Sequence, residues 1–320
     1  MKSMVTQTRE TGREVSTEHP TDPASRLAPC GGAVTLDEEV DAAIAWGLRK
    51  GGRVVVVTGA GVSAESGIPV YRGENGIWTE GGVESMQMAT ASFFVEHPRE
   101  SWEWNLSKRT EIRVAQPNAA HIAIADIGRL LVGRFMLIGQ NVDRLHLRAG
   151  NRPEETVELH GHLEGMRCRG RCQGVFPIPA ALDDWGRTDR LTDAQFALLA
   201  CPLCGGPSRP HVLWFDEFYD EASYGFATAQ RAAAEASLCI TAGTSGGVPI
   251  AGRLAGIAAR AGASLIDVNT ADNPLRQLAI RHGGYIEAAA TEALPALAAA
   301  IGRRLAEGDP EPPDFDGEDA

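Results

Sequence analysis

Residues 58–69 read Thr-Gly-Ala-Gly-Val-Ser-Ala-Glu-Ser-Gly-Ile-Pro and directly follow the apolar run at residues 53–57. A continuous β-branched run of this kind predicts a buried strand of a parallel sheet. The residues after it predict a tight turn into a helix: Gly59 can adopt a left-handed conformation, Gly61 lets the backbone approach a ligand, and Ala64 is small enough for close helix–strand packing. A helix N-terminus binds anions through unpaired N–H groups without needing a lysine. The stretch therefore predicts a phosphate-binding turn of the dinucleotide-binding type.

Strand and helix patterns alternate along the rest of the chain. A capping box with Thr35 at its start precedes a helix that ends at Gly51 and Gly52, and Asn118 begins another helix. Further strand and helix patterns lie at residues 135–138, 238–242, 250–261, 264–268 and 293–305. Such alternation predicts an α/β fold with a doubly wound parallel, Rossmann-like sheet. Residues 85–113 have an apolar helical pattern, for which a place in the core is favoured over a substrate-facing lid.

Four of the six cysteines form two close pairs, Cys168 with Cys172 and Cys201 with Cys204. Around them, over residues 166–210, Cys, Gly, Arg and Pro interrupt the helix and strand patterns. Zinc prefers four thiolates in a tetrahedron, and tight turns let paired sulfurs converge on it. The pairs predict a small inserted module with a structural zinc ion, because four protein ligands leave no open position for a reaction. Two unrelated pairs of free thiols are the alternative.

Four segments in this order resemble signatures of the sirtuin family, the NAD-consuming protein deacylases. They are residues 58–72, residues 140–146, residues 158–161 and residues 243–245. The resemblance covers about residues 36–301, and the joint order of the motifs is far more specific than any one of them. It implies an NAD domain with the inserted zinc module and an NAD-dependent protein-lysine deacylase, with acetyl favoured as the acyl group. NAD is then a co-substrate, cleaved to nicotinamide, and the acyl group passes from lysine to ADP-ribose.

The resemblance also implies roles for individual residues. His160 matches the family's general base, which suits an imidazole whose pKa lies near the working pH. Asn141 and Asp143 are implied as catalytic residues around nicotinamide, although Gln-Asn-x-Asp is also good turn chemistry. Gln140 and Asn269 are implied to bind the two riboses. The full set implied to bind NAD is Gly59, Ala60, Gly61, Glu65, Tyr71, Arg72, Gln140, Asn141, Asp143, Gly243, Thr244, Ser245 and Asn269.

Residues on the substrate side depart from the family pattern. Residues 211–217 resemble the segment that pairs with an acyl-lysine peptide or protein, but Asp216 stands where Gly is usual. Arg144 replaces a residue that permits positive φ and would either contact the acyl group or point to solvent. Gly139 and His162 also differ from the usual residues. No Tyr-x-x-Arg pair precedes Pro117, which favours a neutral acyl group over an acidic one held by Lys108 or Arg144.

The domain organisation follows from these patterns and from composition. We expect a disordered arm over residues 1–34, a catalytic domain over residues 35–305 and a disordered acidic tail over residues 306–320. Within the domain, we expect a helical insert at about 72–115 and the zinc module at about 163–210.

The net charge of −12 argues against nucleic acid as a direct partner. No signal peptide or membrane-spanning run is visible, and paired rather than disulfide-patterned cysteines suggest a reducing, cytoplasmic location.

Three other functions stay open at this point. An NAD glycohydrolase or mono-ADP-ribosyltransferase on the same scaffold would release nicotinamide without an acyl-lysine. A non-catalytic sensor of NAD or ADP-ribose would need no base, so His160, Asn141 and Asp143 argue against it. A plain dinucleotide-binding oxidoreductase fits worst, because no acidic residue stands about twenty residues past the turn.

Overall fold

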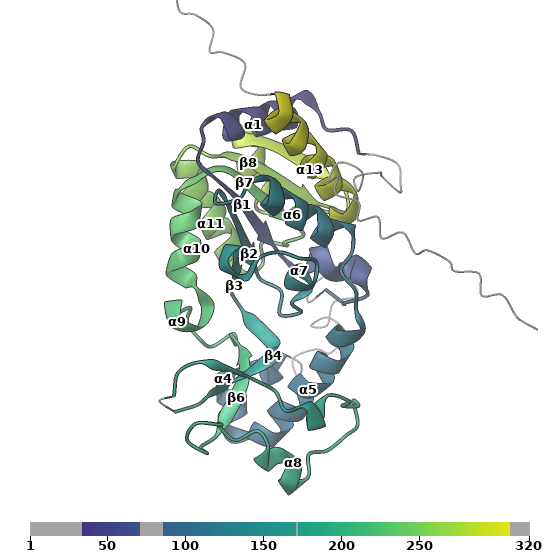
Figure 1. Cartoon of the computed structure of the whole chain (residues 1–320), viewed down its shortest axis with the longest axis vertical. Helices are drawn as coiled ribbons and strands as arrows, with labels where there is room; N and C mark the ends of the chain where they lie inside the picture. Colours follow the sequence, from purple (N-terminus) through teal and green to yellow (C-terminus); the bar gives the residue numbers. More distant parts are fainter. Residues whose placement is uncertain (1–33, 71–85, 171, 308–320) are drawn as a thin grey trace, which may run out of the picture.

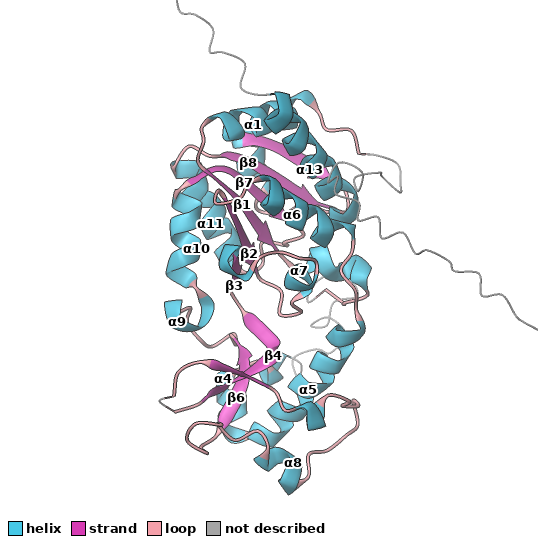
Figure 2. Cartoon of the chain, in the orientation of Figure 1, coloured by secondary structure: helices cyan, strands magenta, loops and turns pink. Residues whose placement is uncertain are grey.

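The predicted parallel sheet is confirmed. The computed structural model describes residues 34–70, 86–170 and 172–307. Its large sheet has six strands, all parallel where they pair (Figure 2). In spatial order they are β3 (Thr156–Glu158), β2 (Phe135–Gly139), β1 (Arg53–Thr58), β7 (Ala236–Ala242), β8 (Ser264–Asn269) and β9 (Gly283–Glu287).

Helices cover both faces of this sheet, which makes it doubly wound (Figure 1). Val54 and Val56 of β1 pack in one apolar core, while Val55 and Val57 pack in the other. The continuous valine run is explained by burial on both faces. The first face is covered by α1 (Glu38–Arg49), α6 (Ala119–Leu130) and α13 (Ala290–Glu307), and the second by α10 (Phe226–Ala234), α11 (Pro249–Arg260) and α12 (Arg276–His282).

A smaller region, which we call the small lobe, comprises the described parts of residues 86–115 and 161–214; the remaining described residues form the sheet lobe. Figure 1 shows the two lobes at opposite ends of the long axis, joined between β3 and β4. The small lobe has an antiparallel sheet of β5 (Val175–Pro177), β4 (Gly161–Cys168) and β6 (Ser208–Val212). Its helices are α4 (Ala91–Glu96), α5 (Pro98–Val114), α8 (Asp193–Ala197) and the short 3₁₀ helix η4 (Ala180–Leu182). Trp102 and Leu106 of α5 are buried in its own apolar core, as favoured from the sequence.

The turn after β1 differs from the prediction in its geometry. Gly59 is extended, with φ −123° and ψ −173°, and the helix that follows is the 3₁₀ helix η2 (Ala60–Ser66). A Cβ on Gly59 or Gly61 would lie 2.8 Å from the backbone of the turn after β7, so both positions need glycine for close approach rather than for a left-handed conformation. Ala64 is exposed and does not pack on the strand.

Several element boundaries also differ. Asp37, not Thr35, caps α1 by accepting a hydrogen bond from the Val40 amide at 2.8 Å. The helical pattern at residues 85–113 is divided at His97 into α4 and α5. Helix α13 continues to Glu307, past the predicted start of the tail. The predicted N-terminal arm up to residue 33, residues 72–85 of the helical insert and the tail from residue 308 lie outside the described residues.

The remaining short helices are α7 (Leu145–Arg148), η3 (Pro153–Glu155) and α9 (Glu221–Tyr224). Across the described ranges, no helix combines the length and hydropathy needed to cross a membrane.

Candidate active site

The candidate site lies at the carboxyl edge of the large sheet. The turns after β1, β2, β3, β7 and β8 all begin at this edge because the strands are parallel. The strand order reverses direction at β1, which pairs with β2 on one side and β7 on the other. Ligands of open α/β sheets bind at such a reversal. The motifs predicted from the sequence therefore meet at one place.

The turns after β1 and β7 lock together at this reversal. The Gly61 amide donates a hydrogen bond to the Gly243 carbonyl at 2.8 Å. Asn269, at the end of β8, donates from its side-chain amide to the Thr244 carbonyl at 2.8 Å. Thr244 is buried and Ser245 is exposed. The structure thus brings the predicted phosphate- and ribose-binding residues of three strands together.

The turn after β2 is held by side-chain amides. Gln140 donates to the Thr58 carbonyl at 3.0 Å, and Asn141 donates to the Gly59 carbonyl at 3.1 Å. Both side chains are buried. The β1 and β2 turns therefore form one unit with little freedom to separate.

Asp143 is buried in the same turn, beside a residue that the sequence reasoning missed. Ser63 of η2 donates a hydrogen bond to Asp143 at 2.7 Å and accepts one from Asn141 at 3.0 Å. Its hydroxyl also lies 3.4 Å from Nε2 of His121. Burial raises the pKa of Asp143, and the hydrogen bonds from the Leu145 amide and Ser63 act in the opposite direction. A serine inside a helical pattern carries no signal of this contact.

His160 lies just past β3 with both ring nitrogens engaged. Its Nδ1 is 2.7 Å from the Gln140 carbonyl, and its Nε2 is 3.0 Å from the hydroxyl of Tyr219. Burial lowers the pKa of His160 to about 4, while the hydrogen bond to Gln140 acts to raise it. This pKa lies below the near-neutral value expected from the sequence because the ring is buried, so the imidazole is neutral at pH 7 and able to accept a proton. Tyr219 was missed because nothing in its sequence context links it to His160.

Arg144 occupies the left-handed region, at φ 61°, the conformation that the residue usual at this position permits. Its guanidinium pairs with Glu158 at 3.3 Å instead of pointing freely to solvent. His162 is buried against His211, with ring centroids 5.0 Å apart. Burial first, and then the charge of Arg144, lowers the pKa of His162 to about 3. Gly139 has room for a side chain, and its replacement of a larger residue has no structural explanation here.

The predicted substrate-pairing segment divides between two structures. His211 and Val212 end β6, while residues 213–217 form no strand. Asp216 accepts hydrogen bonds from the amides of Ala91 and Ser92 at 2.6 and 3.0 Å, the first two amides of helix α4. The departure at Asp216 therefore fastens this loop to the small lobe.

The remaining predicted NAD-binding residues are placed as follows. Glu65 is exposed and accepts a hydrogen bond from Thr291 of α13. Ala60 begins η2. Tyr71 and Arg72 lie outside the described residues.

The four predicted zinc ligands converge in the small lobe. The sulfur atoms of Cys168, Cys172, Cys201 and Cys204 all lie within 4.8 Å of one another. The Cys168 and Cys204 sulfurs are 3.8 Å apart, the edge length of a tetrahedron with Zn–S bonds of about 2.3 Å. Hydrogen bonds from the backbone amides of Cys172 and Gly170 lower the pKa of Cys168 to about 7, whereas the hydrogen bond with Cys204, and then burial, raise the pKa of Cys172 to about 12. Metal binding would deprotonate the thiols. The geometry and donor set fit a structural zinc ion.

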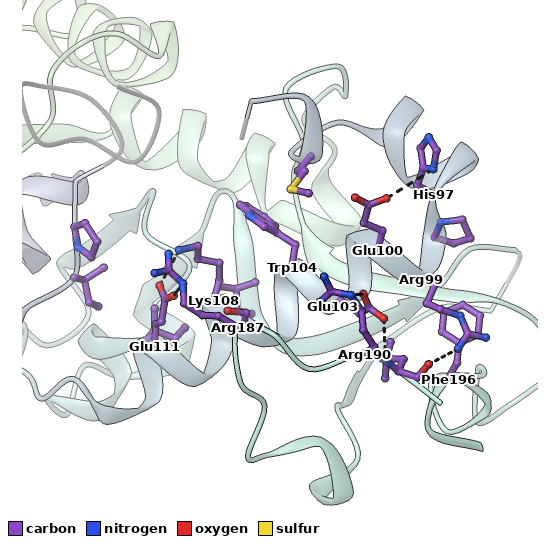
Figure 3. Close-up of a pocket in the computed structure, with 18 of the residues that line it drawn as sticks. His97, Arg99, Glu100, Glu103, Trp104, Lys108, Glu111, Arg187, Arg190 and Phe196 are labelled. Carbon is purple, nitrogen blue, oxygen red and sulfur yellow. Dashed lines mark hydrogen bonds and ion pairs between the residues drawn. The ribbon is translucent and has the colours of Figure 1, made fainter. Parts of the chain in front are cut away.

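A cavity of about 1490 Å³ opens in the small lobe between α5 and residues 187–196 (Figure 3). Trp104 and Lys108 line one wall, and Arg187 and Arg190 line the other. Lys108 and Arg187 both pair with Glu111, so the charges on these walls are matched. His160 and Asn141 do not line this cavity, but Gly67, Ile68 and Pro69 do, and these residues directly follow η2 in the turn after β1.

Comparisons with known proteins agree with this arrangement. A model of the Sir2 family matches residues 59–249. An NAD-dependent protein deacylase of Thermus thermophilus is 38% identical over 235 residues, covering 72% of this chain and 85% of the relative. A solved complex of a Sir2 homologue with NAD superposes with a TM-score of 0.68 and 32% identity, over 88% of this chain and 99% of that one. A Sir2 complex with deacetylated p53 peptide and 3′-O-acetyl-ADP-ribose gives a TM-score of 0.62 and 28% identity, over 80% and 94%.

Proposed function

The chain belongs to the Sir2 family and is an NAD-dependent protein deacylase, and we propose that the carboxyl edge of its sheet carries out the reaction. The observation that carries this proposal is the state of His160. Its Nδ1 is committed to a carbonyl oxygen, which only accepts, so the neutral ring presents the Nε2 lone pair at the edge where the NAD-binding turns meet. A base held in one tautomer at that place suits proton removal from a ribose hydroxyl.

The other residues divide the work of binding and orientation. Gly59, Gly61 and Gly243 let the turns after β1 and β7 pack closely, and we assign these turns to the phosphates of NAD on their motif positions. Asn269 lies at the end of β8 for the adenosine ribose. Asn141 and Asp143 provide the amide and carboxyl groups that a carboxamide ring can bind in a small buried pocket. We assign Thr244, Ser245, Gln140, Ala60, Glu65, Tyr71 and Arg72 to NAD binding on their motif positions.

The reaction balances as an acyl transfer. The acyl oxygen of the modified lysine attacks the anomeric carbon of the nicotinamide ribose, and nicotinamide leaves with the electrons of the broken bond. His160 then takes a proton through the ribose hydroxyls, so that the 2′-oxygen attacks the acyl carbon. Lysine leaves as the free amine and one water molecule adds to the acyl carbon, because the original acyl oxygen stays on the anomeric carbon as its hydroxyl. The products are nicotinamide, free lysine and O-acyl-ADP-ribose.

A neutral acyl group such as acetyl fits the charges of the structure. The two cations considered for an acidic acyl group are both paired, Lys108 with Glu111 at 2.8 Å and Arg144 with Glu158 at 3.3 Å. An acidic acyl group would have to break one of these pairs to gain a partner. We therefore propose deacetylation as the preferred activity.

The partner and location proposals rest on composition and on the cysteines. Net charge −12 supports an acyl-lysine protein rather than a nucleic acid or an anionic membrane as the binding partner. The zinc-type cluster of free thiols supports a reducing, cytoplasmic compartment.

The test is to follow two products at once. The purified chain is incubated with NAD and a panel of acyl-lysine peptides, and nicotinamide and deacylated peptide are both measured. Equal amounts of the two support the deacylase. Nicotinamide without deacylation would instead assign a glycohydrolase or ADP-ribosyltransferase. His160→Ala should reduce deacylation about a hundredfold or more, the usual effect of losing a general base.

A further inference from the structure

The proton-accepting nitrogen of His160 already has a partner within the chain. Tyr219 places its hydroxyl 3.0 Å from Nε2. Because Nδ1 must donate to the Gln140 carbonyl, the neutral ring can only accept at Nε2, so the phenol is the donor. Burial raises the pKa of Tyr219 to about 12, which keeps this proton on the phenol. The three groups form one chain of hydrogen bonds with a single direction.

The loop that carries Tyr219 is fastened on both sides. Asp216 accepts hydrogen bonds from the first two amides of α4 in the small lobe, and Glu217 accepts hydrogen bonds from Arg209 and from the Trp214 amide. The Tyr219 ring stacks on Phe226 at the start of α10, with centroids 5.1 Å apart. These contacts hold the hydroxyl over His160 from two directions, one in each lobe. The hydrogen bond is therefore a built feature of the fold.

The unprotonated nitrogen of a neutral imidazole has one lone pair in the ring plane and accepts one good hydrogen bond. A ribose hydroxyl that gives its proton to His160 needs the same lone pair that Tyr219 now occupies. The two donors cannot both be bound, so one must displace the other.

We propose that Tyr219 is a positioning residue whose hydroxyl holds the place of the reacting ribose hydroxyl on Nε2 of His160 and is displaced when NAD binds. The inference rests on the proposed role of His160. Before NAD binds, the Tyr219 hydroxyl keeps His160 neutral, fixes its orientation and keeps water away from Nε2. Because its hydroxyl must be displaced, Tyr219 slightly weakens NAD binding. In the free enzyme it also lowers the pKa of His160.

The hydrogen bond from Tyr219 sets the direction in which the pKa of His160 shifts. Tyr219 can donate to Nε2 only while His160 is neutral, so the contact lowers the pKa of His160, and its removal raises that pKa. Among the described residues, no charged side chain contributes to the shift in the pKa of His160. The nearby charged groups are engaged elsewhere: Glu158 pairs with Arg144, and Asp143 accepts from Ser63.

The test is Tyr219→Phe, which removes the hydroxyl and keeps the ring on Phe226. We expect the pKa of His160, followed by NMR in the full chain and assigned with His160→Ala, to rise by about 0.5–1 unit. The acid limb of kcat/KM should move to higher pH by the same amount. The KM for NAD should fall about two- to fivefold while kcat stays within about twofold, because a competing hydrogen bond is gone.

Tyr224→Phe is the matched control. Tyr224, the last residue of α9, loses the same atom, but its hydroxyl donates to the Val212 carbonyl at 3.1 Å and accepts from Arg167 at 3.1 Å, with no hydrogen bond to His160. It should lower Tm without moving the pKa of His160 or the KM for NAD.

Two results would overturn the proposal. If Tyr219→Phe leaves both the pKa and the KM for NAD unchanged, Tyr219 has only a packing role. If kcat falls tenfold or more at constant KM, Tyr219 itself moves the proton. Absence of deacylation by the wild-type chain would refute the proposed function, and the NMR titration would still test the hydrogen bond.

Discussion

The sheet lobe and the small lobe are stabilised in different ways. In the sheet lobe, two layers of helices bury both faces of a parallel sheet, and the cores consist mainly of alanine, valine, leucine and isoleucine. The small lobe has one smaller core, with Trp102, Trp185 and Trp214 among its members. It adds a buried arginine with two carboxylate partners and a cluster of four cysteines. The active site lies at the sheet lobe's edge, where the loop that carries Tyr219 contacts His160 and is fastened to the small lobe through Asp216.

Because of this difference, we expect different treatments to unfold the two lobes. Burial of periodic apolar faces stabilises the sheet lobe without any bound ion. The stability of the small lobe depends on a buried arginine that must be paired and on four cysteines that bind a metal ion. The following predictions test that distinction.

Loss of the metal should have the largest effect and should be confined to the small lobe. Structural zinc contributes about 10–16 kcal/mol in small domains that fold only with metal, and a lobe with its own core should lose part of that. Chelation or Cys168→Ala should remove hydrogen-exchange protection from β4 and β6 while β1 and β7 keep theirs.

Cys239→Ala is the matched control for the metal site. Cys239 is a buried free thiol of β7 in the sheet lobe. Its loss should lower overall stability slightly without selective opening of the small lobe. Equal loss of protection in both lobes after Cys168→Ala would contradict the comparison.

Removal of the buried arginine should come next. Arg109 pairs with Glu164 at 3.1 Å and with Asp183 at 2.8 Å, and only 4% of its side chain is exposed. Arg109→Met should cost about 3 kcal/mol in urea unfolding followed by tryptophan fluorescence, since it leaves the carboxylates short of a buried partner. Arg113→Met should cost less than about 1 kcal/mol, because Arg113 meets the same two carboxylates with 38% of its side chain exposed. Equal costs for the two variants would refute this account of the small lobe.

A smaller effect is expected in the sheet lobe at the locked turns. In Gly61→Ala the new Cβ would lie 2.8 Å from the Cα and carbonyl oxygen of Gly243, so backbone must move, at about 1–3 kcal/mol. The measurement is Tm together with NAD affinity, both of which should fall. Gly302→Ala in α13 is the control: its Cβ would sit 3.6 Å from Leu130, and a helical alanine should stabilise by up to about 1 kcal/mol. A Gly61→Ala variant as stable as Gly302→Ala would show that the turns are not locked.

The sequence predicts the sheet lobe well because its signals are local. The valines of β1 alternate between two cores, and that pattern is visible in the residues themselves. The need for glycine at position 59 could not be predicted, since its neighbour Thr244 comes from the turn after β7, far along the chain. The cysteine pairs were found because their chemistry is specific to few residue types.

The contacts that complete the site join residues that are far apart in the sequence. Ser63 on Asp143 and Tyr219 on His160 both join residues from different turns, and neither residue type signals its partner. Arg144 has a φ of 61°, and its pairing with Glu158, which was not predicted, depends on how β3 lies beside the β2 turn. Local sequence patterns predict the strands, whereas tertiary packing determines which side chains form these contacts.

The fate of the acyl group tests the central claim most directly. Mass spectrometry of the products formed from NAD and an acetyl-lysine peptide distinguishes transfer from hydrolysis. We predict acetyl-ADP-ribose in an amount equal to the nicotinamide released, with the signal lost in His160→Ala. Unmodified ADP-ribose accompanied by intact acetyl-lysine peptide would contradict the account.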